Sequence, residues 1–446
     1  MLKVGFVSLG CAKNLVDTEI MLGILAENGI QIIDNPDKAD ILIINTCSFI
    51  DAAKEESIST ALMLAEYKKN GKCRGLILAG CLGERYRQEL LDELPEVDAI
   101  VGTGAWHRIM EAVDGVLAGQ RLLLIGENGE IYDHTTPRVH TGPKHSVYVK
   151  IAEGCNNYCS FCVIPALRGR FRSRSIASVV SEVEKLAAAG TKEVNLIAQD
   201  TTSYGRDQGG QSRLVELLKQ LVKLDIKWIR LLYCYPSYFS DELIDLIANE
   251  PKICKYVDLP LQHADDEILH RMNRRDNKTE IEQLLSKLRQ RIPGIALRTT
   301  FIVGFPGETQ VQFENLKQFV VEQRFDHVGV FTYSQEENTP AAAMDNQVDD
   351  EIKQERYHEL MAIQSKISEE INRSLEGTIF NVLVEGHNLE QPGLAIARSY
   401  REAPDVDGRI YIENASSVKT GQIVAVKVAQ GFAYDLVVEM IDRVPE

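Results

Sequence analysis

The stretch CNNYCSFCVIP, residues 155–165, places three cysteines within eight positions. A structural zinc site needs four ligands, and a disulfide framework needs an even number of cysteines. Three thiolates can instead bind three irons of a four-iron cluster, which leaves the fourth iron free to bind a substrate or cofactor. The spacing therefore predicts an iron–sulfur site at Cys155, Cys159 and Cys162, with a zinc site completed by a distant fourth ligand as the alternative.

The region around this stretch, residues 146–375, alternates strand-like and helical patterns. Apolar runs with strand character are separated by amphipathic stretches such as 176–189 and 311–322, and a charged helix is expected near 349–375. This alternation predicts a partial (β/α)6 barrel of parallel strands, open on one side, with its chemistry at the carboxyl ends of the strands. The six strand candidates are VYVKIAEG, EVNLIAQD, WIRLLYCY, YVDLPL, ALRTTFIVG and HVGVFTY.

Different patterns flank this central region. Residues 1–118 again alternate buried strands and helices, which predicts an N-terminal parallel α/β sandwich. Residues 119–145 are polar and predict a solvated linker with one hairpin at GENGE. Residues 376–446 contain short strands separated by turns, with no long helix, and this predicts a small antiparallel β-barrel.

A second group of cysteines follows the strands of the first domain. Cys11 comes after VGFVSLG, Cys47 after ILIINT and Cys81 after GLILAG. The carboxyl ends of parallel strands share one edge of a sheet, so we expect these three thiols to converge there. The pattern predicts a second metal site, whereas Cys73, Cys234 and Cys254 show no such placement and are interpreted as packing residues.

The motif CNNYCSFC, including the aromatic Phe161, resembles the Cys-x3-Cys-x2-Cys signature of the radical S-adenosylmethionine superfamily. Cys11, Cys47 and Cys81 form the first triad in chain order, and Cys155, Cys159 and Cys162 form the second. Both triads, together with the terminal barrel, resemble the methylthiotransferases, which carry a C-terminal TRAM domain. The resemblance implies two 4Fe–4S clusters and S-adenosyl-L-methionine as cofactors. The cluster on Cys155, Cys159 and Cys162 would generate a 5′-deoxyadenosyl radical, and the cluster on Cys11, Cys47 and Cys81 would supply sulfur. An electron donor such as flavodoxin or ferredoxin is implied as well.

Two substrate classes occur in that family. One branch modifies an aspartate of the small-subunit ribosomal protein uS12, and the other modifies adenosine derivatives in tRNA. The stretches LIAQDTTSYG (196–205) and EAPDVDGRIYI (402–412) resemble the protein-modifying branch. In the tRNA branch, the place of the stretch 196–205 is taken by a pattern like Gly-Gln-Asn-Val-Asn-Ser-Tyr. The resemblance therefore favours the protein substrate, with tRNA as the alternative.

Charge favours the same substrate independently. The chain carries a net charge of −16, and residues 378–446 contain ten acidic and six basic side chains. An RNA-binding module should be basic, whereas an acidic surface suits a basic ribosomal protein. We therefore expect Asp405 and Asp407 to face that partner from a loop. The chain contains no apolar run of membrane-spanning length and no signal-peptide pattern, so a cytoplasmic protein with no membrane partner and with reduced cysteines is expected.

The stretch TTFIVGFPGET, residues 299–309, ends another barrel strand. The resemblance implies that this segment lies against adenine, although Thr300 replaces the first glycine of the family pattern and Glu308 falls one place late. No role is therefore expected for Glu308, and a tight turn explains the glycines equally well. The residues implied to bind the cofactor are Phe161, Gln199, Ile302, Val303 and Gly304, and those implied to line the substrate pocket are Asp200, Gln262 and His263.

Overall fold

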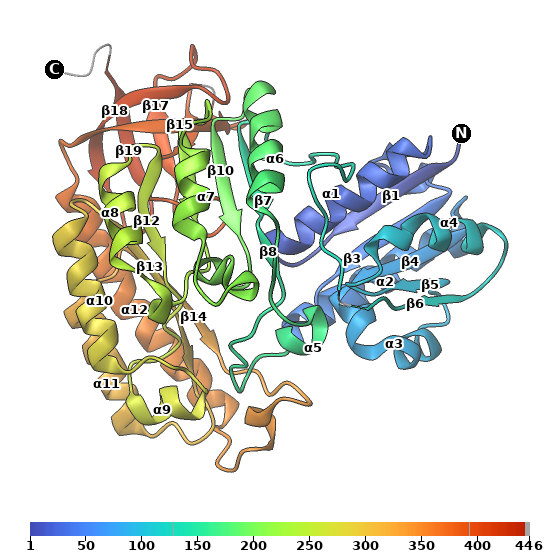
Figure 1. Cartoon of the computed structure of the whole chain (residues 1–446), viewed down its shortest axis with the longest axis horizontal. Helices are drawn as coiled ribbons and strands as arrows, with labels where there is room; N and C mark the ends of the chain where they lie inside the picture. Colours follow the sequence, from blue (N-terminus) through green and yellow to red (C-terminus); the bar gives the residue numbers. More distant parts are fainter. Residues whose placement is uncertain (128, 392, 442–446) are drawn as a thin grey trace.

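The computed structural model describes residues 1–127, 129–391 and 393–441, which form three packed units (Figure 1). The first unit is built on a parallel six-stranded sheet in the order β2-β1-β3-β4-β5-β6. Its strands are β1 (Lys3–Ser8), β2 (Gln31–Ile33), β3 (Ile41–Thr46), β4 (Gly75–Gly80), β5 (Ala99–Val101) and β6 (Leu122–Leu124). Its helices are α1 (Ala12–Glu27), α2 (Asp51–Asn70), α3 (Cys81–Glu93) and α4 (Ile109–Leu117).

Helices cover both faces of this sheet. Residues of α1 and α4 pack on one face in one apolar cluster, and residues of α2 and α3 pack on the other face in a second. Strands buried on both faces read as continuous apolar runs, which is why ILIINT and GLILAG are buried along their whole length. The predicted parallel α/β sandwich is confirmed.

The segment 119–145 differs from the solvated linker that its composition predicts. Its first residues form β6, which pairs with β5, so the sheet extends beyond the predicted boundary at residue 118. Arg138 then forms ion pairs of 2.6 Å with Glu19 of the first unit and 2.6 Å with Glu182 of the second. The described residues of GENGE form no strand, and Asn128 lies outside the described residues.

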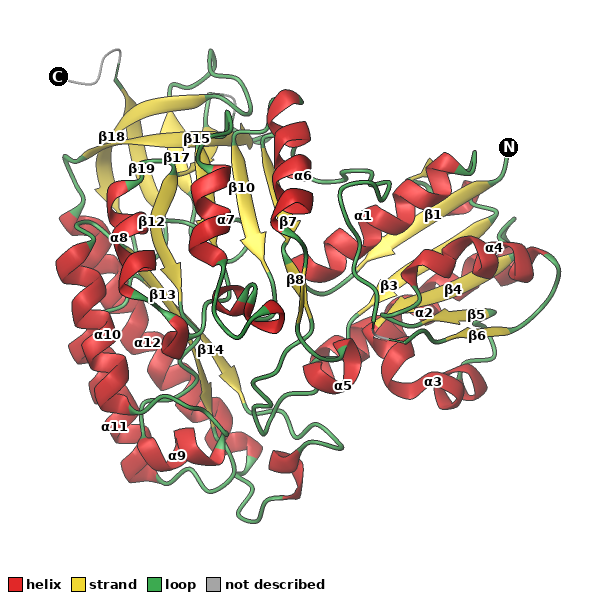
Figure 2. Cartoon of the chain, in the orientation of Figure 1, coloured by secondary structure: helices red, strands yellow, loops and turns green. Residues whose placement is uncertain are grey.

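The second unit contains six parallel strands in the order β14-β13-β12-β11-β10-β7, an open sheet that forms the partial barrel expected from the sequence (Figure 2). Its strands are β7 (Ser146–Lys150), β10 (Glu193–Ile197), β11 (Trp228–Leu231), β12 (Ile253–Asp258), β13 (Ala296–Val303) and β14 (His327–Thr332). A short pair, β8 (Ala152–Glu153) and β9 (Arg172–Ser173), flanks the cysteine loop. The helices are α5 (Ile164–Arg168), α6 (Ile176–Ala188), α7 (Leu214–Leu221), α8 (Asp241–Asn249), α9 (Asp266–Arg271), α10 (Lys278–Arg291), α11 (Gln310–Gln323) and α12 (Asp350–Ser374).

The third unit is a closed five-stranded barrel in the order β15-β16-β17-β19-β18. The strands are β15 (Ile379–His387), β16 (Ala395–Arg398), β17 (Ile410–Glu413), β18 (Ile423–Gly431) and β19 (Leu436–Met440). The expected barrel is present, but one of its pairings, β17 with β19, is parallel rather than antiparallel. Buried Arg398 binds Glu193 and Ser146, the first residues of β10 and β7, so this barrel lies at the amino ends of the partial barrel's strands.

The loop after β16 enters the partial barrel from that end. Ala403 packs in an apolar cluster with Tyr256 of β12 and Ala296 of β13. Asp407 accepts a 2.7 Å hydrogen bond from the Tyr256 hydroxyl and pairs with Arg298 at 3.2 Å, and its side chain is 2% exposed. The expectation that Asp407 faces a basic partner is therefore wrong, because its carboxylate is needed to balance a buried arginine. Asp405 is exposed, and it accepts a 3.0 Å hydrogen bond from Tyr148.

Within the described part of the chain, no helix is both long and apolar enough to cross a membrane.

Candidate active site

Cys11, Cys47 and Cys81 lie at the carboxyl ends of β1, β3 and β4, three adjacent strands. Gly10 has a φ of 86°, and a β-carbon there would lie 3.2 Å from the sulfur of Cys47, so the loop carrying Cys11 packs closely on Cys47. Asn14 stabilises this arrangement, because its amide donates hydrogen bonds to Leu9 and Thr46 and its oxygen lies 3.7 Å from the Cys81 sulfur. The structure therefore brings the first triad together.

The electrostatic surroundings of the first triad differ among its members. Burial raises the pKa of the Cys81 thiol to about 12, Arg168 opposes this, and the neighbouring Cys47 and Cys11 add to it. Burial also acts to raise the pKa of Cys11, but the positive charges of Lys13 and Arg168 outweigh it and the net pKa is lowered. Cys11 is exposed, whereas Cys47 and Cys81 are buried.

Cys155, Cys159 and Cys162 lie in the loop between β8 and α5. The loop is held by backbone hydrogen bonds from Cys155 to Gly169 at 3.2 Å and from Cys162 to Cys159 at 3.0 Å. Burial raises the pKa of Cys155 to about 11 and also raises the pKa of Cys162, and in each case the adjacent Cys159 adds to the shift. The three thiols of the second triad are therefore close neighbours.

The donor sets of both triads fit an iron–sulfur group. Thiolates are the ligands that hold such clusters, and each triad offers sulfur alone. Among the residues that the structure describes, no three His, Cys, Asp or Glu side chains are grouped closely enough to bind a single metal ion.

Asp200 follows β10, and the structure gives it a supporting role. Its buried carboxylate accepts hydrogen bonds of 2.8 Å from Asn157 and Thr202, and of 3.1 and 2.7 Å from the backbone and hydroxyl of Ser203. These bonds leave the carboxylate occupied by protein donors. Asp200 thus positions the loop of the second triad through Asn157, and we find no support for its predicted place in a substrate pocket.

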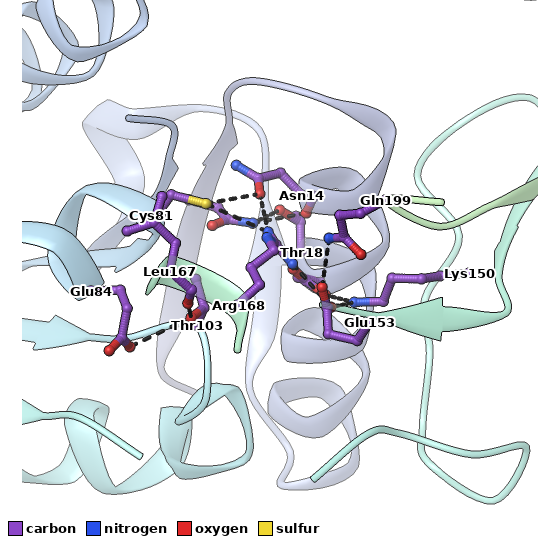
Figure 3. A network of polar contacts seen from close by, with 12 residues as sticks. Asn14, Thr18, Cys81, Glu84, Thr103, Lys150, Glu153, Leu167, Arg168 and Gln199 are labelled. Carbon is purple, nitrogen blue, oxygen red and sulfur yellow. Dashed lines mark hydrogen bonds and ion pairs between the residues drawn. The ribbon is translucent and has the colours of Figure 1, made fainter. Parts of the chain in front are cut away.

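Gln199 lies beside Glu153 and Lys150 in the polar network around Arg168 (Figure 3). Its side-chain nitrogen donates a 2.7 Å hydrogen bond to Glu153, and its buried oxygen has no hydrogen-bond partner among residues 1–127, 129–391 and 393–441. An acceptor that is buried and unpaired is costly, so a donor from a ligand is expected there. Gln199 remains a candidate for cofactor binding.

The ends of β12 and β13 lie beside the second triad. Phe161, between Cys159 and Cys162, packs with Ile302 against one apolar cluster that includes Phe305. Val303 is fully buried, whereas a β-carbon on Gly304 would collide with Lys353 of α12 at 2.3 Å. Phe161 and Ile302, both implied to bind the cofactor, thus pack on the same apolar cluster, while the glycine at 304 is explained by helix packing.

Gln262 and His263 follow β12, and Gln262 lies beside Phe301 of β13. Gln262 has a φ of 73°, and its backbone is bonded to both Thr300 and Ile302 at 2.8 Å. His263 is fully buried, and burial lowers its pKa to about 3, with the Arg356 charge adding to the effect. Its Nδ1 accepts a hydrogen bond from the Asp265 backbone, and its Nε2 has no partner in the described part of the chain. His263 is therefore neutral and offers one ring nitrogen to a ligand.

Arg168 connects the two triads, and the sequence provided no signal for it. The guanidinium lies 3.6 Å from the Cys81 sulfur and binds Asp17 at 2.9 Å and Glu153 at 3.0 Å (Figure 3). Glu153 in turn accepts hydrogen bonds from Lys150 at 2.5 Å and from Gln199. An arginine shortly after a cysteine motif has no distinctive spacing, so only the structure reveals this network.

Comparison with known sequences now places the chain. Residues 3–102 match an uncharacterized protein family, UPF0004, residues 149–320 match the radical SAM superfamily, and residues 377–441 match the TRAM domain. A protein of Syntrophotalea carbinolica named ribosomal protein uS12 methylthiotransferase RimO is 52% identical over 446 residues, 100% of this chain and 98% of that protein. A protein of the same name from Geobacter sulfurreducens is 51% identical, with 98% of each chain covered.

The chain belongs to the RimO family of radical SAM methylthiotransferases.

Solved structures show how widely the fold of this methylthiotransferase occurs. The radical S-adenosylmethionine methyltransferase TsrM of Kitasatospora setae matches 94% of the chain with a TM-score of 0.57 and 15% identity, over 80% of its own length. The cobalamin-dependent S-adenosylmethionine radical enzyme OxsB matches 82% of the chain with a TM-score of 0.51 and 12% identity, over 56% of its own length. At such identities the likeness shows the fold alone.

A second contact joins the first two units of the methylthiotransferase beside Ser48, the residue after Cys47. Buried Glu336, after β14, pairs with Arg85 of α3 at 2.6 Å and with Lys54 of α2 at 3.1 Å. Arg85 also donates a 2.8 Å hydrogen bond to the carbonyl of Ser48, next to Cys47. Ion pairs therefore join the first two units at Arg168 and at Glu336.

Proposed function

We propose that this methylthiotransferase inserts a methylthio group at the β-carbon of one aspartate of the small-subunit ribosomal protein uS12. The observation that carries the proposal is that the segment directly after the second triad packs on the first, because Val163 and Leu167 contact Cys81 and Arg168 lies 3.6 Å from its sulfur. The name shared by relatives of about 50% identity supports uS12 as the substrate. A ribosomal substrate would place the reaction in the cytoplasm.

Each triad would hold one 4Fe–4S cluster in this proposal. Cys155, Cys159 and Cys162 would hold the cluster that binds S-adenosyl-L-methionine, and this pair would supply the radical chemistry that activates a C–H bond. The sulfur would come from the group on Cys11, Cys47 and Cys81. The protein's part is to orient the cofactor and exclude water. The apolar wall of Phe161, Ile302 and Val303 would contact the cofactor, and the unpaired atoms of Gln199 and His263 would supply polar contacts.

Two partners follow from this chemistry. A one-electron donor such as flavodoxin or ferredoxin would reduce the cluster. The substrate protein is expected to be basic, which suits a chain with a net charge of −16. The tRNA alternative is disfavoured for the same reason, because phosphate backbones are bound by clustered Lys and Arg.

The cofactor count can be tested by anaerobic reconstitution. Two four-iron clusters should give about eight irons per chain. Replacing Cys155, Cys159 and Cys162 with Ala should halve this amount, and so should replacing the first triad. A matched variant lacking Cys73, Cys234 and Cys254 should keep all of it, because these residues are scattered in the core. A wild-type protein that never exceeds about four irons would contradict the two-cluster proposal.

The substrate can be tested by competition. Purified enzyme, S-adenosyl-L-methionine and a reductant are supplied with uS12 and with tRNA together. A mass increase corresponding to a methylthio group on a uS12 aspartate is expected. Modification of tRNA adenosine, with none of uS12, would establish the alternative instead.

A further inference from the structure

Arg168 belongs to one unit and contacts a cysteine of the other. It is the last residue of α5, which directly follows the second triad in the chain, and it is 97% buried. One of its terminal nitrogens, Nη2, donates a hydrogen bond to the side-chain oxygen of Asn14 and lies 3.6 Å from the Cys81 sulfur. Val163 and Leu167 of the same segment pack against Cys81. The first triad therefore receives a buried positive charge from outside its own unit.

Two carboxylates fix the direction of this charge. The other terminal nitrogen, Nη1, binds Asp17 at 2.9 Å and Glu153 at 3.0 Å. The guanidinium is planar and rigid, so anchoring Nη1 keeps Nη2 directed at the sulfur of Cys81. Asp17 and Glu153 offset part of the positive charge, and Lys150 offsets part of theirs. Lys13 is the second cation near the triad, and its charge acts on Cys11.

A donor aimed at a ligating sulfur has a known electronic effect. The reduced form of an iron–sulfur cluster carries one more negative charge than the oxidised form. Hydrogen bonds and positive charge at the sulfur therefore favour reduction, and burial strengthens the effect. We propose that Arg168 is a positioning residue that raises the reduction potential of the cluster on Cys11, Cys47 and Cys81. The proposal rests on the first-triad cluster of the proposed function.

The experiment uses the full chain with Cys155, Cys159 and Cys162 replaced by Ala, so that only the first triad can bind a cluster. In this background the EPR signal of the reduced cluster is followed during a redox titration. Arg168→Gln should lower the ratio of reduced to oxidised cluster at a fixed potential about tenfold, which corresponds to a potential about 59 mV lower for a one-electron couple. Arg168→Lys keeps the charge but cannot bind both carboxylates and reach the sulfur, so a smaller decrease is expected.

The control is Arg170→Gln, which removes an exposed positive charge two residues away and should leave the potential unchanged. An Arg168→Gln potential equal to that of the parent protein would overturn the proposal. If Arg168→Gln binds no iron, Arg168→Lys decides, and a potential equal to the parent's overturns it. A parent protein that binds no iron in this background would refute the first-triad cluster itself, which is a separate result.

Discussion

The side chain of Asn157 donates a 2.8 Å hydrogen bond to Asp200, and this bond joins the loop of the second cysteine triad to the end of β10. Asn157 lies between Cys155 and Cys159, so its position affects both. Asp200 caps the short turn that follows β10 through Ser203. This carboxylate is thus one of the anchors of the loop, beside the hydrogen bonds that Ser160 makes to Arg271 and Met272.

Replacing Asp200 with Ala should weaken iron binding at the second triad. The substitution removes four hydrogen bonds to a carboxylate and leaves Asn157 unpaired in the interior, so we expect a loss of about 3 kcal/mol in unfolding free energy. Iron content after reconstitution and denaturant unfolding would measure both effects. Ser203→Ala removes the hydroxyl's bond alone and should cost about 1 kcal/mol. An Asp200→Ala protein with full iron content would show that the loop does not need this anchor.

Asp407 and Asp405 should respond very differently to replacement by Ala. Loss of Asp407 leaves Arg298, whose side chain is only 14% exposed, with Asp258 as its one remaining ion-pair partner among the described residues, and breaking such a largely buried pair costs about 3 kcal/mol. Asp405 is exposed, and its loss should cost at most about 1 kcal/mol. Denaturant unfolding monitored by circular dichroism would measure the difference. Equal effects of the two substitutions would contradict the buried position of Asp407.

This pair shows where sequence reasoning stops. The PDVDG turn has the composition of a loop, and it is a loop, but a loop can enter a barrel instead of facing solvent. The partner of Asp407 is Arg298, which lies 109 residues earlier in the chain, and no local pattern indicates such a pairing. The grouping of the six cysteines could be expected from the sequence, unlike the pairing of Asp407 with Arg298. Strand ends share one edge of a sheet, and a short motif brings its own residues together. The elements and the fold class of each unit were predictable, whereas contacts between units were not.

Glu308 should make stability depend on pH. Burial raises its pKa to about 7, although Arg356 at 3.2 Å opposes the shift. The ordinary value is about 4.3, so between about pH 4 and pH 7 the folded protein binds more protons at this group than the unfolded chain does. Its contribution to stability is therefore present at low pH and is lost as pH rises through this range. Glu308→Gln cannot ionise, and its Tm relative to wild type should increase from pH 5 to pH 8. A constant Tm difference across this range would contradict the shift.

Glu336 should stabilise the contact between the first two units through its ion pairs with Arg85 and Lys54. Glu336→Ala leaves Arg85 and Lys54 without their buried partner, which should cost about 3–5 kcal/mol. Hydrogen exchange should increase in α2 and α3, which carry these two cations. The matched control is Glu337→Ala, since Glu337 is half-exposed, pairs with Arg85 at 3.2 Å and should cost at most about 1 kcal/mol. Unchanged exchange in Glu336→Ala would show that the units are held together elsewhere.

The position of the terminal barrel sets a length requirement for any protein that docks on it. Buried Arg398 and the inserted loop attach this barrel at the amino ends of the strands, while the cysteine triads lie near the carboxyl ends. Strands of five to eight residues separate the two levels by about 20 Å. Buried contacts on both sides of the attachment hold the barrel at this level. A docked partner can present only a residue that stands about that far from its own point of contact, so distance alone would select among several exposed aspartates.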